Sequence, residues 1–375
     1  MLQIELVDTR NPRQVNDFVM FPFKLYKGVA QWVPPFIGDI KLMLNREKHP
    51  FYDHSDADFF VAKREGEIVG RIAAMENKPY NQYHGTKQAV FYLFECVDDQ
   101  DVADSLFNRA FEWAAARGLN RIVGPKGFSP FDGYGIQVEG LEHRCMMTMM
   151  NYNLAYLPRL VEALGFETEV DFVSCYIAGE HFQLPEKAQE IARRVQERGT
   201  FFVQKFKSKR ELMKWVDPIG DAYNKCFVNN WEYYPLTKHE IQFQLNNLLS
   251  VVDPKLVKII LHKEEVIGFL LAFPDISSAL QRQGGRITPW GIVDMMLEMK
   301  RTKWVSLNGV GVLPEYHGRG ANALLYSEME KTIQDYGFEH AEQTQMADSA
   351  IQVRKDMVTI GAKIYKRHRV YRRSI

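Results

Sequence analysis

The sequence predicts an α/β (α+β) protein made of two similar units in tandem, and three observations carry this prediction. Residues Val310–Leu325 run from an apolar strand through a glycine-bearing turn directly into a helix. The same order of hairpin, strand and helix occurs once before, 198 residues earlier in the chain. Finally, 375 residues with 46% hydrophobic and 13% aromatic side chains are enough for two packed cores.

The internal repeat is visible in two pairs of segments. Glu67–Ala74 (EIVGRIAA) matches Glu265–Ala272 (EVIGFLLA), and Leu160–Phe166 matches Met357–Ala362 at nearly the same offset. Between these anchors, each half carries an apolar strand, a helix of about four or five turns and a closing glycine. This shared order of elements favours two copies of one α/β unit over chance similarity.

The boundary between the copies is expected in Ala178–Glu186, which gives a first domain of residues 1–180 and a second of residues 181–375. A helix over Lys187–Arg198 and a strand over Phe201–Phe206 would open the second domain. Asp275–Lys300 reads as an insertion between two strands of the second copy. Such an insertion is either a functional loop or a purely structural one.

The turn at Gly318 and Gly320 predicts a site for an anion. Glycine allows close approach of the backbone to a ligand and conformations closed to other residues. A helix from about Ala321 presents unpaired N–H groups and the positive end of its dipole to the same point. Phosphate is the expected anion, and an ordinary strand-to-helix turn is the alternative. Further elements are expected downstream: a strand at Glu339–Gln345, a helix at Ser349–Ile360 and a strand at Ala362–Tyr371.

This stretch resembles the acetyl-CoA-binding motif of the GNAT superfamily, the GCN5-related N-acyltransferases. The family pattern is V-x-V-x-P-x-Y-[QR]-G-x-G-[IA]-[GA] before an apolar helix. His317 stands where the family prefers Gln or Arg, and Asn322 stands where it prefers Gly or Ala. The matching residues are Val310, Val312, Pro314, Tyr316, Gly318, Gly320 and Ala321.

The resemblance implies two GNAT-like acyl-CoA N-acyltransferase units, each a twisted mixed, mainly antiparallel sheet flanked by helices. It also implies acetyl-CoA or another acyl-CoA as co-substrate. The backbones of Val310 and Val312 would pair with the pantetheine. The pyrophosphate would be bound by His317, Gly318, Arg319, Gly320, Ala321 and Asn322.

The first copy lacks the corresponding glycines. Its strand and helix are joined by Phe91–Asp101, in which Asp98 and Asp99 are suited to cap the helix. Their charges would repel a pyrophosphate. The first half also resembles bacterial proteins in which a degenerate GNAT-like unit precedes an intact one. The segments that carry this resemblance are Trp32–Pro35, His49–Phe51, Gly70–Ala74, Gly124–Pro125 and Leu164–Phe166.

The function implied is acyl transfer, with acetyl-CoA as the expected donor and the amine of a small molecule or peptide as acceptor. The alternative is a non-catalytic acyl-CoA-binding or scaffold protein with the same fold. Aminoacyl transfer from tRNA, which a tandem architecture allows, would need a basic groove. A formal net charge of zero gives that reading little support.

Candidates for proton transfer are harder to choose. Many family members carry a base on the strand before the motif, but Trp304–Val312 contains no carboxylate. Many also use a tyrosine in the last helix as the acid, and Met357 occupies that position. The remaining candidates are Glu315 beside the turn, Tyr365 and Tyr371 on the closing strand, and Glu232 in the second copy.

Composition narrows the partners and the location. Zero net charge indicates no nucleic-acid partner, and no run approaches the ~20 apolar residues of a membrane span. No signal peptide is apparent, so a cytoplasmic monomer or homodimer without a membrane partner is expected. The four cysteines lie far apart and form neither a disulfide framework nor a zinc motif, and no metal is expected.

Overall fold

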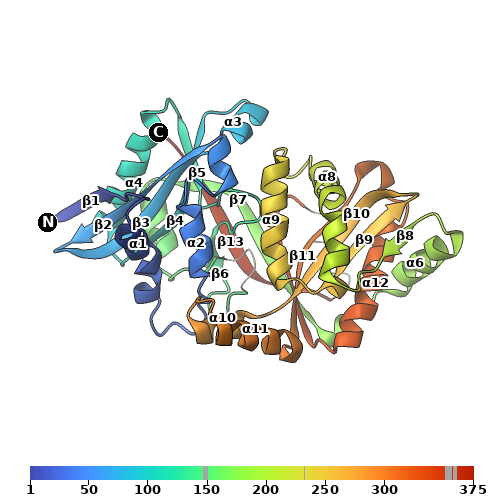
Figure 1. Ribbon diagram of the computed structural model, residues 1–375. Coiled ribbons are helices and arrows are strands. Elements are labelled where there is room, and N and C mark those ends of the chain that lie inside the picture. Colours follow the sequence, from blue (N-terminus) through green and yellow to red (C-terminus); the bar gives the residue numbers. More distant parts are fainter. Residues whose placement is uncertain (147–150, 232, 351–356, 358–360) are drawn as a thin grey trace. The chain divides into compact units, whose positions relative to one another are not determined.

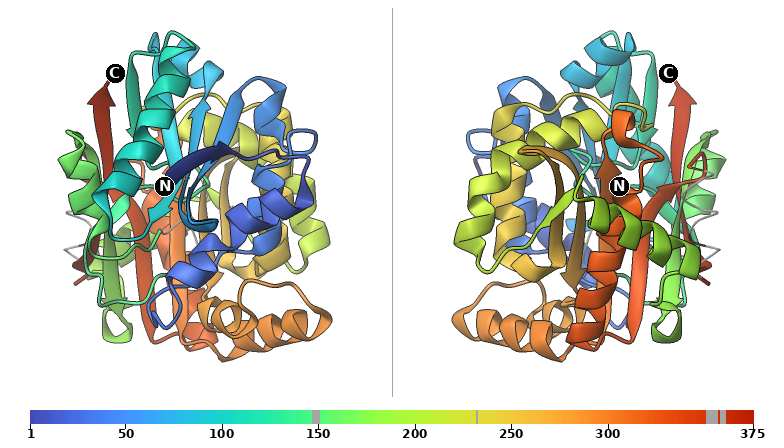
Figure 2. Two further views of the ribbon diagram at one scale, coloured as in Figure 1. Left: turned by 90° about the vertical axis from the view of Figure 1, so that its left-hand side faces the viewer. Right: turned by 90° about the vertical axis from the view of Figure 1, so that its right-hand side faces the viewer.

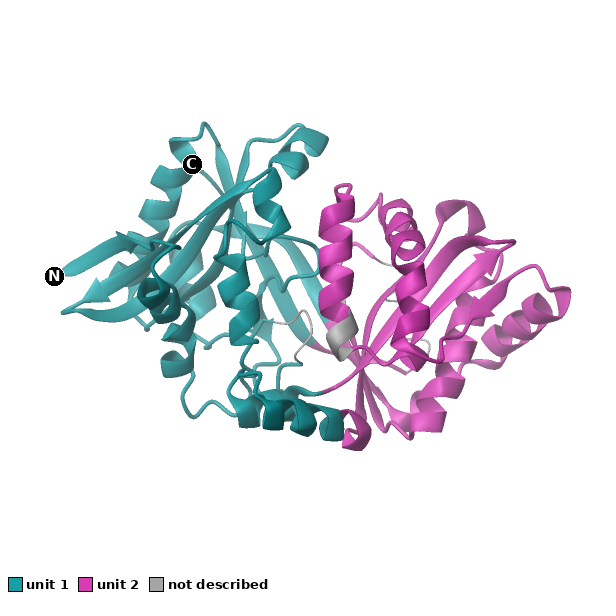
Figure 3. Cartoon of the chain, viewed as in Figure 1, with its two compact units in different colours: residues 1–173, 276–298, 366–375 teal, residues 174–275, 299–365 magenta. Residues whose placement is uncertain are grey.

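The computed structural model describes residues 1–375 except 147–150, 232, 351–356 and 358–360, and it contains two compact units (Figure 1, Figure 3). Unit 1 comprises residues 1–173, 276–298 and 366–375. Unit 2 comprises residues 174–275 and 299–365. Both units are therefore assembled from segments that are distant in the sequence.

Unit 1 is a sheet with helices on both faces. The strand order is β1-β2-β3-β4-β5-β13-β7, with β6 paired to β13. The pair β4–β5 is parallel, whereas β1–β2, β2–β3, β3–β4 and β5–β13 are antiparallel. Its elements are β1 (Leu2–Leu6), α1 (Pro12–Leu25), α2 (Ile37–Met43), η1 (Pro50–Asp53), β2 (Asp56–Arg64), β3 (Glu67–Glu76), α3 (Lys78–His84), β4 (Gln88–Cys96), α4 (Gln100–Ala115), β5 (Arg121–Gly124), β6 (Ile136–Glu139), α5 (Leu157–Ala163), the first part of β7 (Glu167–Ala178), α10 (Ser277–Gln283), most of α11 (Pro289–Arg301) and most of β13 (Lys363–Ser374).

The two faces of this sheet bury different residues, as the twofold alternation of a strand requires. Phe60 and Ile72 pack with α4 and α5 on one face, and Phe59 and Met75 pack with α1 and α2 on the other. Both faces of β2, β3 and β4 are covered in this way. Long apolar runs in these strands follow from that double coverage.

Unit 2 has the same plan. Its strand order is β7-β12-β11-β10-β9-β8, with β11–β12 parallel and β8–β9, β9–β10 and β10–β11 antiparallel. Helix α8 packs against β10, and α12 packs against β9, β10 and α6. The elements are the end of β7, η2 (Gly179–His181), α6 (Glu186–Arg198), β8 (Phe202–Gln204), α7 (Lys209–Leu212), η3 (Met213–Trp215), α8 (Val216–Cys226), α9 (Lys238–Val251), η4 (Pro254–Leu256), β9 (Val257–His262), β10 (Glu265–Pro274), β11 (Trp304–Val312), η5 (Pro314–Tyr316), α12 (Ala321–Tyr336), β12 (His340–Ala347) and the start of β13.

The internal repeat is confirmed in three dimensions. Each copy has a hairpin, β2–β3 or β9–β10, followed by a strand, a long helix and a strand parallel to the first. The repeated glycines, Gly70 and Gly268, lie where a side chain would collide with a neighbour. A Cβ would come within 2.8 Å of Leu106 at Gly70 and within 2.6 Å of the Gly311 carbonyl at Gly268. Close packing explains why both copies carry glycine at this position.

The compact units differ from the contiguous halves 1–180 and 181–375 that the sequence predicts. Strand β13 ends the second copy in sequence, but its residues 366–375 pair with β5 of unit 1 and bury Val370 and Tyr371. Residues 276–298 also belong to unit 1, where Gln281 donates to the carbonyls of Ala30 and Trp32. Hydrophobic periodicity defines a strand but not the sheet that it joins. The helix expected at Ser349–Ile360 lies almost wholly outside the described residues.

Candidate functional site

The glycine turn of unit 2 connects β11 to α12 as the sequence predicts. Gly318 and Gly320 have φ values of 72° and 85°, and helix α12 begins at Ala321. This helix is the orange-red one in the right-hand view of Figure 2. Gly320 is the N-cap residue, and no side-chain hydrogen bond caps the helix. The first N–H groups of α12 are therefore left for solvent or a ligand, at the positive end of the helix dipole.

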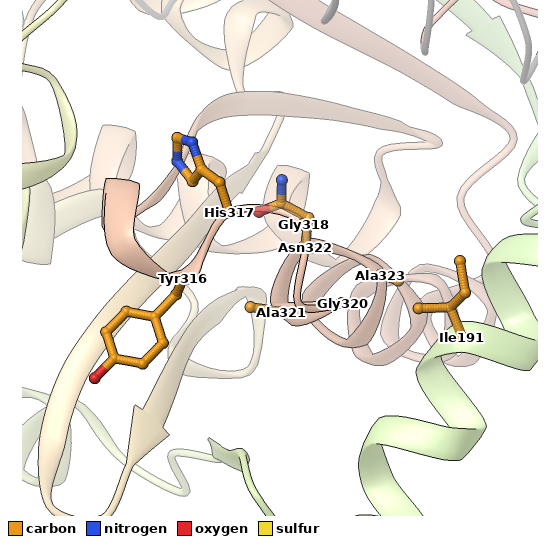
Figure 4. Close-up of a pocket in the computed structure, with 8 residues that line it drawn as sticks. All are labelled: Ile191, Tyr316, His317, Gly318, Gly320, Ala321, Asn322 and Ala323. Carbon is orange, nitrogen blue, oxygen red and sulfur yellow. The ribbon is translucent and has the colours of Figure 1, made fainter.

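A hollow of about 240 Å³ opens at this turn. Five of the residues predicted to bind the cofactor line it, namely His317, Gly318, Gly320, Ala321 and Asn322. Figure 4 shows Ile191 reaching toward them from the neighbouring helix α6. That the hollow binds an acyl-CoA stays a prediction.

Two side chains hold the turn against the sheet. The Tyr316 hydroxyl lies 3.0 Å from Nδ1 of His262 on β9, and its ring packs edge-on against Phe201. His317 Nε2 lies 2.7 Å from the carbonyl oxygen of Val312 at the end of β11. His317, which departs from the family pattern, thus ties the turn to the strand. Arg319 does not line the hollow and places its guanidinium over the Tyr316 ring.

Glycine occupies the two positions of the turn for different structural reasons. At Gly320 a Cβ would lie 2.6 Å from Val195 and 2.9 Å from Ile191, because α6 packs directly on the turn. At Gly318 a Cβ would meet nothing within 4 Å, so only the positive φ favours glycine there. Gly318 therefore offers a substitution site that leaves the packing of the unit intact.

Strand β11 bulges and then parts from its parallel neighbour. Leu270 of β10 faces Val310 while Ala272 faces Leu307, so Asn308 and Gly309 together oppose one residue of β10. Gly309 adopts φ 89°, as a glycine bulge requires. Within the described residues, the registered pairs of β11 with β12 end at Leu307 and Gln343. The bulge thus lies at the point where the two strands separate.

Beyond the bulge, the backbone of β11 faces the opened side. The Leu313 N–H donates to the Ile267 carbonyl of β10. Backbone groups alternate in direction along a strand, so those of Val312 and Val310 point away from β10. Their orientation suits backbone pairing with an extended ligand, although the Val312 carbonyl also takes the contact with His317.

A buried polar cluster lies at the point of separation and was not anticipated from the sequence. Asn308 of β11 accepts hydrogen bonds at Oδ1 from the hydroxyls of Thr344 on β12 and Ser306 on β11, the latter at 3.2 Å. Its Nδ2 group is buried and has no hydrogen-bond partner among the described residues. Because both hydroxyls engage Oδ1, they orient the amide so that Nδ2 is the unused donor.

A tyrosine–glutamate pair joins β12 to the start of β13. The Tyr365 hydroxyl donates to Oε2 of Glu342, a buried residue of β12, over 2.5 Å. Glu342 and Thr344 are two residues apart and therefore share one face of β12. Thr344 in turn contacts Asn308. Tyr365 is thus connected, through Glu342, to the face that carries the Asn308 cluster.

The other catalytic candidates lie elsewhere. Glu315 is exposed on η5, and its charge adds to burial in raising the pKa of the Cys226 thiol to about 12, which leaves that thiol protonated. Tyr371 is buried in unit 1, where its hydroxyl donates to Glu162 at 2.9 Å. The structure therefore does not bring Tyr371 and the turn together within one unit. Glu232 lies outside the described residues.

In unit 1 the corresponding helix terminus is occupied by the chain itself. The Asp99 side chain caps α4 by accepting from the Asp101 N–H, and Arg64 pairs with the same carboxylate at 2.7 Å. Asp98 pairs with Arg159. A carboxylate fills the place that a phosphate would take, so the two copies differ at this point in chemistry rather than in fold.

Comparison with known proteins was made at the level of sequence and of structure. No family model matches the chain. The chain is 25% identical over 379 residues to the bacterial ceramide synthase of Caulobacter vibrioides, with 99% of this chain and 98% of that protein covered. It is 24% identical over 376 residues to protein YghO of Escherichia coli, with 97% and 94% covered.

Among solved structures, the chain is similar to a tandem GNAT protein from the clavulanic acid biosynthesis pathway. The TM-score is 0.56 at 10% identity, and the match covers 100% of this chain and 98% of the other. No helix among the described residues is long and apolar enough to cross a membrane. The chain therefore has the fold of the GNAT superfamily of N-acyltransferases, in its tandem form.

Proposed function

We propose that the protein transfers an acyl group from an acyl-CoA to an amine. The observation that carries this proposal is the glycine turn of unit 2, where an uncapped helix terminus and a hollow meet the end of a bulged strand. Unit 1, in which Asp99 fills the equivalent terminus, provides the internal contrast. Retention of the uncapped turn in one copy supports a working anion site there.

The residues present fit an acyl-CoA in three places. The first N–H groups of α12, with Asn322 beside them, would bind the pyrophosphate. The backbones of Val310 and Val312 face the opened side of β11 and would pair with the pantetheine. The Asn308 Nδ2 donor lies at the bulge. A pantetheine that runs along β11 from the turn would bring the thioester carbonyl to this point.

Asn308 supplies the electrostatic part of the reaction. When the amine nitrogen forms a bond to the thioester carbon, negative charge develops on the carbonyl oxygen. A buried, already oriented amide N–H stabilises that charge without reorganisation. The charge then re-forms the carbonyl as the C–S bond breaks and CoA leaves as its thiolate.

Glu342 and Tyr365 supply the proton transfers in this proposal. The attacking amine must lose a proton, and the departing thiolate must gain one. Glu342 would accept the proton of the amine, and Tyr365 would donate its hydroxyl proton to the thiolate. The hydrogen bond between the two side chains would then return the proton from Glu342 to Tyr365. Glu315 remains the alternative base, because it lies beside the turn on η5.

The proposed donors include acyl groups longer than acetyl, and the proposed acceptors include amines larger than small molecules. The name of the ceramide synthase from Caulobacter vibrioides points to a fatty acyl group and a long-chain amine for that relative. Its similarity along the full chain supports testing the same class here. Acetyl-CoA stays within the proposal as the shortest donor.

The experiment is a matrix of acyl-CoA chain lengths against amines, including long-chain amino alcohols, amino acids and small polyamines. Release of free CoA thiol would be followed by a thiol reagent, and the amide product would be identified by mass spectrometry. The proposal expects that thiol is released only when both substrates are present. It also expects a product with the mass of the acyl-CoA plus the amine, minus the mass of free CoA. Binding of acyl-CoA without turnover for any amine would instead support a non-catalytic acyl-CoA-binding protein.

A further inference from the structure

The insertion in the second copy carries an exposed apolar helix. Six of the fifteen large hydrophobic side chains exposed among the described residues lie within residues 287–297. Trp290 is 82% exposed and Met296 57% exposed, which is unusual for side chains of this size. The other four are Ile287, Ile292, Val293 and Leu297.

Helix α11 is amphipathic in the inverse sense, with polar groups toward the protein and apolar groups outward. Asp294 and Glu298 are both ion-paired to Arg282 of α10, at 2.9 and 2.5 Å. On the same inner side Met295 packs against a small core around Leu280. Of the six exposed side chains, all but Ile287 lie in the helix. At 100° per residue they fall on the side of the helix opposite to Asp294, Met295 and Glu298. A helix that only covered a domain would show the reverse pattern.

The inner side of this insertion is firmly attached to unit 1. Gln281 donates to the carbonyls of Ala30 and Trp32, and the Ile37 N–H donates to the Gly285 carbonyl. At Gly285 a Cβ would lie 2.2 Å from the Pro35 carbonyl oxygen, so the two backbones are in close contact. Helices α10 and α11, orange in Figure 1, therefore present the apolar face from a fixed support.

Basic groups border the apolar face. A hollow of about 520 Å³ beside the start of α11 is lined by Lys41 and Arg286 together with Met20, Ile37 and Ile287. Neither Lys41 nor Arg286 forms an ion pair within the described part of the chain. The last turn of α11 carries Lys300 and Arg301. Positive charge therefore lies at both ends of the exposed helix.

We propose that the outer face of α11, with the hollow at Lys41 and Arg286, docks on the surface of an anionic lipid bilayer. An apolar helix face with an exposed tryptophan and flanking basic residues matches the requirements for a helix lying in the interface. The basic groups would meet lipid phosphates, each adding electrostatic attraction.

This proposal departs from the sequence-based expectation of no membrane partner. That expectation rested on the absence of a spanning segment and on zero net charge. A helix that lies on the surface needs neither, because its binding depends on one apolar face and on local charge. Docking is also independent of the acyl transfer proposed above, since it uses residues of unit 1 and the insertion.

The test is flotation of the full chain with vesicles of phosphatidylcholine alone or mixed with phosphatidylglycerol. The variant Trp290→Glu/Met296→Glu removes two apolar side chains from the face. Its matched control, Phe202→Glu/Met213→Glu, makes the same chemical change at two exposed residues of unit 2. A third variant, Lys41→Glu/Arg286→Glu, tests the charged border.

The expected result is flotation with the anionic vesicles that falls at least about tenfold for Trp290→Glu/Met296→Glu and stays unchanged for the control. Lys41→Glu/Arg286→Glu would lose the preference for anionic over neutral vesicles. Absence of flotation by the parent protein would overturn the proposal. So would a parent dimer, seen by light scattering, that only the α11 variant dissociates, because the face would then be a self-interface. Binding of soluble acyl-CoA, measured by calorimetry, is expected to be the same in the parent protein and in all three variants, whether or not the chain floats with vesicles.

Discussion

Asn308 is the residue on which the chemistry of the site depends most directly. Its amide is held at Oδ1 by two hydroxyls, and Nδ2 remains buried and unpartnered. An unpartnered buried donor costs free energy in the ligand-free fold. Such a cost is typical of groups that find their partner in a substrate or transition state.

Replacing Asn308 by Ala is expected to lower kcat by about 100-fold while KM for the acyl-CoA changes little, because the donor acts on charge that develops only in the transition state. Steady-state kinetics with the best donor and amine would measure this. Ser306→Ala is the control, since it removes one contact to Oδ1 and leaves Nδ2 in place. A change in KM alone would contradict the role given to Asn308.

His368 predicts a pH dependence of the stability of unit 1. Burial lowers the pKa of His368 from 6.5 to about 4, and its Nε2 lies 2.9 Å from the Asn151 carbonyl oxygen. Between these pH values the unfolded chain binds a proton that the folded chain does not. Stability is therefore lost as pH falls from about 6.5 to about 4, by about 3 kcal/mol for this one group.

His368→Gln keeps a hydrogen-bond donor and removes the titration. The stability advantage of the parent over this variant is expected to shrink by about 3 kcal/mol as pH falls from 6.5 to 4. Denaturant unfolding at several pH values measures the difference. Asp132 has the opposite sign, because burial raises its pKa to about 6, but it is present in both proteins and cancels. An advantage that is constant across this range would contradict a buried, neutral His368.

At the residue level the sequence located the turn but not the groups that face it. The positions of Gly318, Gly320 and Ala321 could be predicted because a short sequence motif specifies a turn from a strand into a helix. Asn308 and Thr344 are 36 positions apart and meet only because β11 and β12 have one particular parallel register. No local pattern encodes that register. Glu342 was missed for the same reason, and Ile191 was missed because it reaches the turn through the packing of α6.

Strand β13 is the element whose position the sequence could not specify. Its residues 363–365 lie in unit 2, where Tyr365 contacts Glu342, and residues 366–375 complete the sheet of unit 1 beside β5. The sequence predicted a strand at Ala362–Tyr371 but not its neighbours. The strands that pair with it, β5, β6 and β7, all come from the first copy, and only tertiary pairing determines this.

Removing residues 366–375 is expected to unfold unit 1, because it takes away the antiparallel partner of β5, which then pairs with β4 alone, and deletes Val370 and Tyr371 from the core. Hydrogen exchange would report this as lost protection in β4 and β5. Removal of Ile375 alone is the control, since it deletes a half-exposed residue beyond the strand. Unchanged protection of β4 and β5 in the longer deletion would contradict the discontinuous unit.

The whole molecule contains two copies of one fold that differ at the start of the long helix, which Asp99 caps in unit 1 and no side chain caps in unit 2. The order of elements and the tandem GNAT fold were predictable, because both depend on periodicity and on a motif of short range. The division into discontinuous units was not predictable, since β13 and residues 276–298 join unit 1 through contacts distant in sequence. In this account unit 2 binds the acyl donor, and unit 1 carries a support for docking.

The central claim is that an acyl-CoA binds at the turn of unit 2, and calorimetric titration of acyl-CoAs into a matched pair of variants tests it most directly. Gly318 and Gly337 are both exposed, both have positive φ (72° and 65°), and a Cβ would meet no crowding at either. They differ in lying at opposite ends of α12. The account predicts that Gly318→Glu weakens binding at least about tenfold while Gly337→Glu binds like the parent. Equal binding by both variants, or no binding of any acyl-CoA by the parent, would contradict it.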